Sequence, residues 1–126
     1  MIAEITNRAK ILIADDDEAV RFLLGDELSS LGYEVETVSD GDEAIELLKM
    51  RRFDVVLLDI KMKRVDGFDV LKYVKANSPE TRVIMLTAYG DVRNAIESLH
   101  LGASDLISKP YDLDDVIATI ERTLNR

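Results

Sequence analysis

The chain has 126 residues, of which 47% are hydrophobic and 33% are charged, and its formal net charge is −9. These values are typical of one globular domain with its own core, and the negative charge argues against nucleic-acid binding by this domain. The sequence has no cysteine, which excludes disulfides and thiolate metal sites. No apolar run is long enough to span a membrane and the first residues lack a signal-peptide pattern. We therefore expect a cytoplasmic protein without membrane contact.

Five short segments predict β-strands. Three of them, residues 10–14, 55–59 and 82–86, are apolar without alternation, which is typical of strands buried on both faces in the middle of a parallel sheet. The other two, residues 34–38 and 106–107, alternate in polarity or are very short. These two are expected at the edges of the sheet.

Apolar residues at helical spacing predict a helix after each strand. In the first helix the apolar stripe comprises Val20, Leu23, Leu24, Leu28 and Leu31, and in the fourth it comprises Val92, Ala95, Ile96 and Leu99. Five strands alternating with five helices predict an α/β fold, a flavodoxin-like, doubly wound, five-stranded parallel sheet in the order 2-1-3-4-5. Residues 10–126 are expected to form this domain and residues 1–9 a short leader.

Polar side chains follow four of the predicted strands. Asp15 and Asp16 follow the first strand, Asp59 ends the third, Thr87 follows the fourth and Lys109 follows the fifth. Because parallel strands end at one edge of the sheet, these groups should converge. Three carboxylates about 5 Å apart repel by roughly 3 kcal/mol per pair at an effective dielectric of about 20. A hard cation relieves that repulsion, and an all-oxygen site suits Mg²⁺.

Several other chemistries lack the residues that they need. There is no Walker-type phosphate loop, no dinucleotide fingerprint, and no serine- or cysteine-nucleophile motif around the single histidine, His100, which we expect at the surface. What remains is a carboxylate beside a metal, with a hydroxyl and an ammonium group that can hold phosphoryl oxygens. An aspartate in that setting can accept a phosphoryl group as an acyl phosphate.

The chain resembles a response-regulator receiver domain of two-component signalling over residues 9–124. The matching fragments are, in chain order, 11–17, 57–62, 66–67, 86–88, 102–103 and 109–110. The resemblance implies that Asp59 accepts a phosphoryl group from a histidine kinase or phosphotransfer protein. It also implies a Mg²⁺ site, whose ligands would be Asp16, Asp59 and the backbone carbonyl of Lys61 directly, and Asp15 through water.

The resemblance also assigns the remaining polar residues. Thr87 would hydrogen-bond the phosphoryl group and move toward it, Lys109 would pair with a phosphoryl oxygen, and the Lys109–Pro110 bond is cis in many relatives. Such a domain is a switch that assists its own phosphorylation and dephosphorylation, and not an enzyme with an external substrate. The run 87–92 most resembles receivers fused to ATPase-type transcription activators, so we expect a transcriptional output. Relatives use the face of the fourth helix, fifth strand and fifth helix for output or dimerisation, so a homodimer through that face is an expectation here.

Two positions depart from the family pattern. Lys63 stands where the family usually has proline, so that Lys61, Lys63 and Arg64 make the loop after Asp59 basic. These charges are either ordinary solvated loop charges, or they change the lifetime of the phosphoryl group or the docking of the kinase. Leu106 stands where many relatives have an aromatic residue that swings inward on activation.

Two other functions of this fold lack residues that they need, and a third stays open. A haloacid-dehalogenase-type phosphatase needs an acid two residues after the nucleophile, where this chain has Lys61. A flavodoxin-like FMN carrier needs a hydroxyl- and glycine-rich first loop, and the acidic residues 15–17 would repel its phosphate. A receiver that signals without phosphorylation stays open.

Overall fold

The structure, a computed structural model, describes residues 9–88 and 90–125. The expected leader lies outside these residues apart from Ala9. The elements in chain order are β1 (Lys10–Ala14), α1 (Glu18–Ser30), β2 (Glu34–Val38), α2 (Gly41–Met50), β3 (Val55–Asp59), α3 (Gly67–Asn77), β4 (Arg82–Thr87), α4 (Val92–His100), β5 (Asp105–Ser108) and α5 (Leu113–Leu124). Within the described ranges, no helix is both long and apolar enough to cross a membrane.

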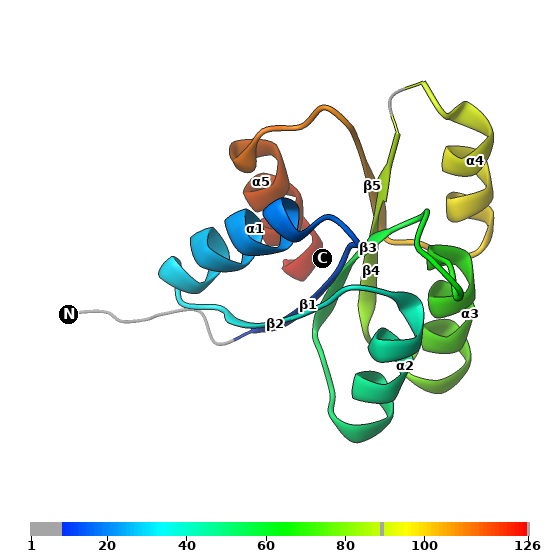
Figure 1. The fold of residues 1–126 in the computed structure, drawn as a ribbon, viewed down its shortest axis with the longest axis horizontal. Helices are drawn as coiled ribbons and strands as arrows, with labels where there is room; N and C mark the ends of the chain where they lie inside the picture. The colour runs from blue at the N-terminus through cyan, green and yellow to red at the C-terminus, as the bar shows by residue number, and fades with distance from the viewer. Residues whose placement is uncertain (1–8, 89, 126) are drawn as a thin grey trace.

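The five strands form one parallel sheet in the order β2-β1-β3-β4-β5. This confirms the predicted fold class and the two predicted edge strands. Helices α1 and α5 cover one face of the sheet, and α2, α3 and α4 lie on the other (Figure 1). The carboxyl ends of β1, β3, β4 and β5 therefore share one edge, where the polar residues of interest lie.

The core is divided between the two faces because successive side chains of a strand point to opposite sides. On β1, Ile11 and Ile13 pack with the residues beneath α1 and α5, while Leu12 packs with those beneath α2 and α3. On β3, Leu57 and Leu58 divide in the same way, and all residues of this strand are buried. The central strand is thus fixed on both faces, which leaves its last residue in a rigid position.

Every helix begins at an aspartate whose side chain accepts a hydrogen bond from a backbone N–H of the first turn. These N-cap residues are Asp17, Asp40, Asp66, Asp91 and Asp112. An aspartate there satisfies an otherwise unpaired donor and places negative charge at the positive end of the helix dipole.

The apolar stripes of two helices differ from the expectation. On α1, Leu23 is exposed and Leu31 is an exposed C-cap residue instead of a helical core position. On α4, all three large apolar residues, Val92, Ile96 and Leu99, are more than half exposed, and the small Ser98 is the buried one. A periodic stripe identifies an apolar face of a helix, but it does not determine whether that face meets the sheet.

Candidate phosphoacceptor and metal site

Strand register brings the predicted site residues to one edge of the sheet. Asp59 is paired with Leu86, so that Thr87 lies one residue beyond this pairing on the neighbouring strand. Ala14 is paired with Leu58, which places Asp15 next to Asp59 across β1 and β3. The structure therefore brings together side chains that are far apart in the sequence.

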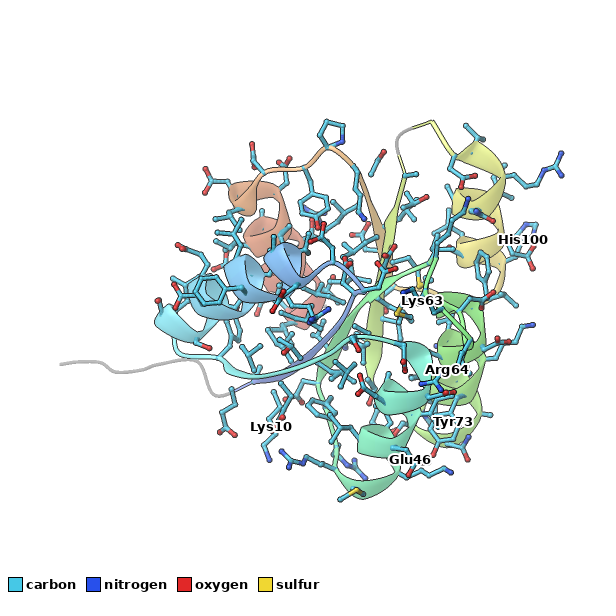
Figure 2. The ribbon with its side chains drawn as sticks, viewed as in Figure 1. Lys10, Glu46, Lys63, Arg64, Tyr73 and His100 are labelled. Carbon is cyan, nitrogen blue, oxygen red and sulfur yellow. The ribbon has the colours of Figure 1, made fainter. Side chains whose placement is uncertain are left out.

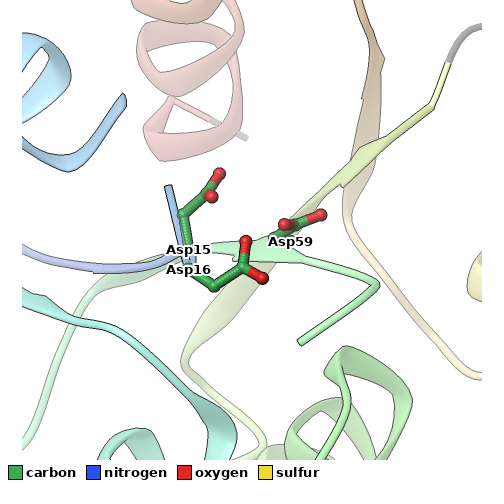
Figure 3. Close-up of side chains that lie close together, drawn as sticks. All are labelled: Asp15, Asp16 and Asp59. Carbon is green, nitrogen blue, oxygen red and sulfur yellow. The ribbon is translucent and has the colours of Figure 1, made fainter. Parts of the chain in front are cut away.

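The three carboxylates form one cluster. Each of Asp15, Asp16 and Asp59 offers an oxygen, and these three oxygens lie within 4.8 Å of one another (Figure 3). Asp15 and Asp59 are buried, whereas Asp16 is exposed. Such a cluster presents only hard oxygen donors and is open to solvent on the side of Asp16, which matches the partly hydrated sites that Mg²⁺ prefers.

Burial and mutual repulsion act on the two buried carboxyl groups. Burial, followed by the charge of Asp15, raises the pKa of Asp59 to about 6, against the lowering effects of Lys109 and the Lys61 backbone N–H. Burial also raises the pKa of Asp15, although its Oδ1 accepts a hydrogen bond from the Asp17 N–H at 2.9 Å. Asp15 Oδ2 is buried without a hydrogen-bond partner among the described residues. An unpaired buried oxygen beside two further carboxylates fits a bound hydrated cation.

Lys109 brings a positive charge to the cluster. Its Nζ lies 3.9 Å from Asp59 Oδ1, and its backbone N–H donates to the Thr87 carbonyl at 2.8 Å. The Lys109–Pro110 peptide bond is cis. The lysine is therefore held by β4 while its side chain reaches the end of β3, where it can pair with an anion on Asp59.

Thr87 ends β4, which lies on the other side of β3 from β1. It is therefore on the opposite side of Asp59 from Asp15 and Asp16. It is buried, and its Oγ1 has no hydrogen-bond partner within the described part of the chain. A hollow of about 130 Å³ beside it is lined by residues that include Ala95 and Leu106. The half-buried Leu106 lies where many relatives have the aromatic residue. A free buried hydroxyl is available to donate to a phosphoryl oxygen.

The loop between β3 and α3, residues 60–66, contacts the acceptor through its backbone. The Lys61 backbone N–H lowers the pKa of the Asp59 carboxyl group, and the Lys61 and Lys63 side chains are exposed. The direct ligation of Mg²⁺ by the Lys61 carbonyl stays a prediction. Arg64, the third basic residue, forms ion pairs with Asp40 and Asp42 at the start of α2. It is therefore engaged with another helix and not with the acceptor.

Three features around the site were not predicted from the sequence. The pairing of Arg64 with Asp40 and Asp42 is one, and nothing in the sequence marks this contact between residues more than twenty positions apart. Arg21 of α1 donates to the Asp15 backbone carbonyl at 2.8 Å, which anchors the acidic turn. The Tyr111 hydroxyl is buried without a partner among the described residues, and burial followed by Asp15 and Asp59 raises its pKa to about 12. Its position two residues after Lys109 was the available signal. Asp17 is the N-cap of α1, and His100 is exposed as predicted.

Comparison with known proteins agrees with this arrangement. The response regulator receiver domain model matches residues 11–121. A probable transcriptional regulator ycf27 of Guillardia theta is 41% identical over 123 residues, which cover 98% of this chain and 48% of the relative. The regulatory protein AtoC of Escherichia coli (strain K12) is 38% identical over 115 residues, which cover 91% of this chain and 25% of that protein. The chain thus spans about half or a quarter of these curated relatives.

Solved structures show the same fold. NtrX from Brucella abortus superposes with a TM-score of 0.89 at 35% identity, over 94% of this chain and 27% of that chain. The receiver domain of a Francisella response regulator superposes with a TM-score of 0.87 at 30% identity, over 94% of this chain and 98% of that chain. With the family match over most of the sequence, these likenesses show that the chain belongs to the response-regulator receiver domain family.

Proposed function

We propose that this domain is a phosphorylation switch in which Asp59 accepts a phosphoryl group from the phosphohistidine of a histidine kinase or phosphotransfer protein. The observation that carries this proposal is the convergence of three carboxylate oxygens within 4.8 Å, with the Lys109 ammonium 3.9 Å from Asp59. Mg²⁺ would be held by Asp16, Asp59 and the Lys61 carbonyl, with Asp15 acting through a bound water. The oxygen-only donor set and the unpaired Asp15 Oδ2 support this ligand set.

The transfer uses the groups already present around Asp59. A carboxylate oxygen of Asp59 attacks the phosphorus, the phosphorus–nitrogen bond to the donor imidazole breaks, and its electron pair returns to the imidazole nitrogen. Since the pKa of Asp59 is about 6, the carboxylate is mostly ionised at neutral pH and can act as the nucleophile. When bound, Mg²⁺ neutralises charge on the carboxylates and on the transferring group. Lys109 pairs with one phosphoryl oxygen and the Thr87 hydroxyl donates to another.

We further propose that the domain is a switch and not an enzyme with an external substrate. The acyl phosphate forms and is hydrolysed on its own side chain, so the domain assists both reactions without releasing a modified substrate. On phosphorylation, Thr87 would leave its unpaired position and bias β4, α4 and β5 toward a second arrangement. The hollow beside Thr87 gives the segment around Leu106 room to move.

The output of this switch is proposed to be transcriptional, in the cytoplasm. The curated relatives include a probable transcriptional regulator and a regulatory protein that are longer than this chain, which supports an output domain in the complete protein. NtrX has also been solved in complex with ATP, which supports the placement among receivers of ATPase-type activators. A homodimer would form through α4, β5 and α5, where the exposed Val92, Ile96 and Leu99 offer an apolar contact surface.

The proposal is tested by intact-mass spectrometry after incubation with acetyl phosphate, with and without Mg²⁺, using Asp59→Asn as control. A phosphoryl adduct that requires Mg²⁺ and is absent from Asp59→Asn is the expected result. Absence of the adduct from the wild-type protein at all Mg²⁺ concentrations would contradict the proposal and favour a receiver that signals without phosphorylation.

A further inference from the structure

The loop after the acceptor is attached to the start of α2 by one side chain. The Arg64 guanidinium contacts two carboxylates. Its Nη2 lies 3.2 Å from Asp40 Oδ2, and its Nε lies 3.2 Å from Asp42 Oδ2. Arg64 has a φ of 59°, and it is the only non-glycine residue with positive φ in the described part of the chain. Arginine has no intrinsic preference for this left-handed conformation. The interactions around it therefore have to hold the loop in this shape. The side chains of Arg64 and of its neighbour Lys63 are labelled in Figure 2.

Backbone contacts fix both ends of the same loop. A Cβ on Gly41, the first residue of α2, would lie 2.2 Å from the Val65 carbonyl oxygen, so the two backbones are in close contact next to Arg64. In addition, the Gly67 N–H donates to the Ile60 carbonyl at 2.8 Å, which joins the two ends of the loop at its base. Arg64 adds the polar link at the point where the loop meets α2.

The carboxylate that receives Arg64 is itself firmly placed. Asp40 Oδ1 accepts the Glu43 N–H of the first helical turn at 3.1 Å, while Glu43 Oε1 accepts the Ser39 N–H at 2.8 Å. The pair resembles a capping box, except that Glu43 binds the N–H of Ser39, one residue before the N-cap Asp40. The Glu43 N–H bond, together with Arg64, holds the pKa of Asp40 below its usual range. Arg64 thus binds to a rigid helix terminus and not to a mobile surface group.

The chain segments on both sides of the Arg64–Asp40 ion pair lie next to residues of the acidic cluster. On the loop side, the Lys61 backbone N–H lowers the pKa of Asp59, and Gly67 at the end of the loop packs closely against the Asp59 backbone carbonyl. On the α2 side, Asp40 follows Val38 by two residues, and the Val38 carbonyl accepts the Asp15 N–H at 3.2 Å. The link therefore joins the segment beside Asp59 to the segment beside Asp15.

We propose that Arg64 is a positioning residue for the metal and phosphoryl site. By holding residues 60–66 against the start of α2, it fixes the Lys61 backbone beside Asp59 and increases the affinity of the cluster for Mg²⁺. This role rests on the proposed function of Asp59 and its metal, and it differs from a general effect of basic charge in the loop.

A positioning contact and a positive charge acting through space should change Mg²⁺ affinity in opposite directions. A positive charge acting through space repels Mg²⁺, so its removal should leave Mg²⁺ affinity unchanged or increase it. Loss of a positioning contact should instead decrease Mg²⁺ affinity. Lys63 is the matched control because it lies in the same loop, is exposed, and carries the same charge. No ion pair of Lys63 occurs among the described residues.

The test compares Mg²⁺ binding by isothermal titration calorimetry in wild type, Arg64→Gln, Arg64→Lys and Lys63→Gln. We expect Arg64→Gln to bind Mg²⁺ about threefold more weakly, in line with the coupling of exposed charged pairs, and Lys63→Gln to bind it equally or more tightly. Arg64→Lys keeps the charge but cannot contact both carboxylates with a planar guanidinium. Its Mg²⁺ affinity should therefore lie between those of wild type and Arg64→Gln. Amide hydrogen exchange of residues 60–66 in the metal-free protein should be faster in Arg64→Gln than in Lys63→Gln.

Partner substitutions give a second check. Asp40→Asn keeps a side-chain oxygen for the helix cap but removes the charge that pairs with Arg64. If Arg64 acts through this contact, the effects of Asp40→Asn and Arg64→Gln on Mg²⁺ affinity should not add in the double variant. Equal affinities of Arg64→Gln and Lys63→Gln, or unchanged exchange of the loop amides, would overturn the inference. Failure of the proposed function would be seen separately, as absence of Mg²⁺ binding by the wild-type protein.

Discussion

The Lys109 ammonium lies 3.9 Å from Asp59 Oδ1, and it opposes the influences that act against ionisation of this carboxylate. Burial and the neighbouring charge of Asp15 raise the pKa of Asp59 to about 6, while Lys109 lowers it. The pair keeps a buried nucleophile ionised near neutral pH and places a cation where phosphoryl oxygens would lie. Its position depends on three strands, since Lys109 follows β5, is hydrogen-bonded to β4 and reaches the end of β3.

Replacement of Lys109 by glutamine should shift the pH dependence of Mg²⁺ binding. In the wild type, Mg²⁺ affinity should fall as the pH drops through about 6, because protons compete with the cation for Asp59. Without Lys109 the pKa of Asp59 is higher, so the same loss should occur at higher pH. Calorimetric titrations between pH 5 and 8 measure the midpoint, with the exposed Lys72→Gln on α3 as control. Superimposable pH profiles for Lys109→Gln and wild type would contradict this reading of the pair.

Asp59→Asn should stabilise the metal-free protein at pH 8 and not at pH 4. The pKa of Asp59 is raised from 3.8 to about 6 on folding, so ionisation costs stability as the pH rises through this window, and the full cost is present above it. Without screening the shift corresponds to about 3 kcal/mol, and solvent screening should reduce this to about 1 to 2 kcal/mol. Urea unfolding in EDTA at the two pH values measures the difference. An exposed control, Asp26→Asn on α1, should show no such dependence on pH.

Thr87→Val should abolish the response to phosphorylation without reducing the free energy of unfolding. The Thr87 hydroxyl is buried without a partner among the described residues, so its removal should leave the free energy of unfolding unchanged or increase it by up to about 1 kcal/mol. Thr81→Val is the matched control, because the buried Thr81 hydroxyl donates to the Phe53 carbonyl at 2.7 Å and its loss should cost about 1 to 3 kcal/mol. Phosphorylation should change the amide exchange of α4 in the wild type, and this change should be absent from Thr87→Val. A loss of stability equal to that of Thr81→Val would show that the hydroxyl is paired in the folded protein.

Gly67→Ala should disturb the acceptor directly. A Cβ at this position would lie 2.4 Å from the Asp59 carbonyl oxygen and 2.8 Å from Ile60 Cα, and both neighbours are backbone atoms. We expect a loss of about 2 to 3 kcal/mol in the free energy of unfolding, together with weaker Mg²⁺ binding. Gly25→Ala is the control within α1, where the nearest atom would be 3.5 Å away, and it should stabilise the protein by about 0.5 to 1 kcal/mol. Equal stabilities of the two variants would show that the loop yields without affecting the site.

The fold and the acidic cluster were predictable from the sequence because both depend on patterns that a chain shows directly. Unbroken apolar runs identified the central strands, and parallel topology then required Asp15, Asp16 and Asp59 to share one edge of the sheet. No contact between distant side chains had to be known for this step. The ligand roles inferred from the family resemblance stay predictions.

The remaining features depend on how elements pack, which periodicity does not encode. The apolar stripe of α4 predicted a buried face, but only the small Ser98 is buried, and Val92 and Ile96 are exposed. The sequence shows that Lys61, Lys63 and Arg64 make the loop basic, but it does not distinguish the roles of the three charges. The structure separates them, because the left-handed conformation of Arg64 directs its guanidinium to α2. That conformation arises from the loop and helix together and has no signal in the sequence.

The central claim is that Asp59 carries the phosphoryl group, and reductive trapping of the acyl phosphate followed by peptide mapping tests it most directly. The protein is incubated with acetyl phosphate and Mg²⁺ and then treated with borohydride, which converts an aspartyl phosphate to homoserine with loss of phosphate. The account predicts homoserine at position 59 and at no other aspartate, including Asp15 and Asp16. Homoserine at another position, or its absence from every peptide of a protein that binds Mg²⁺, would contradict it.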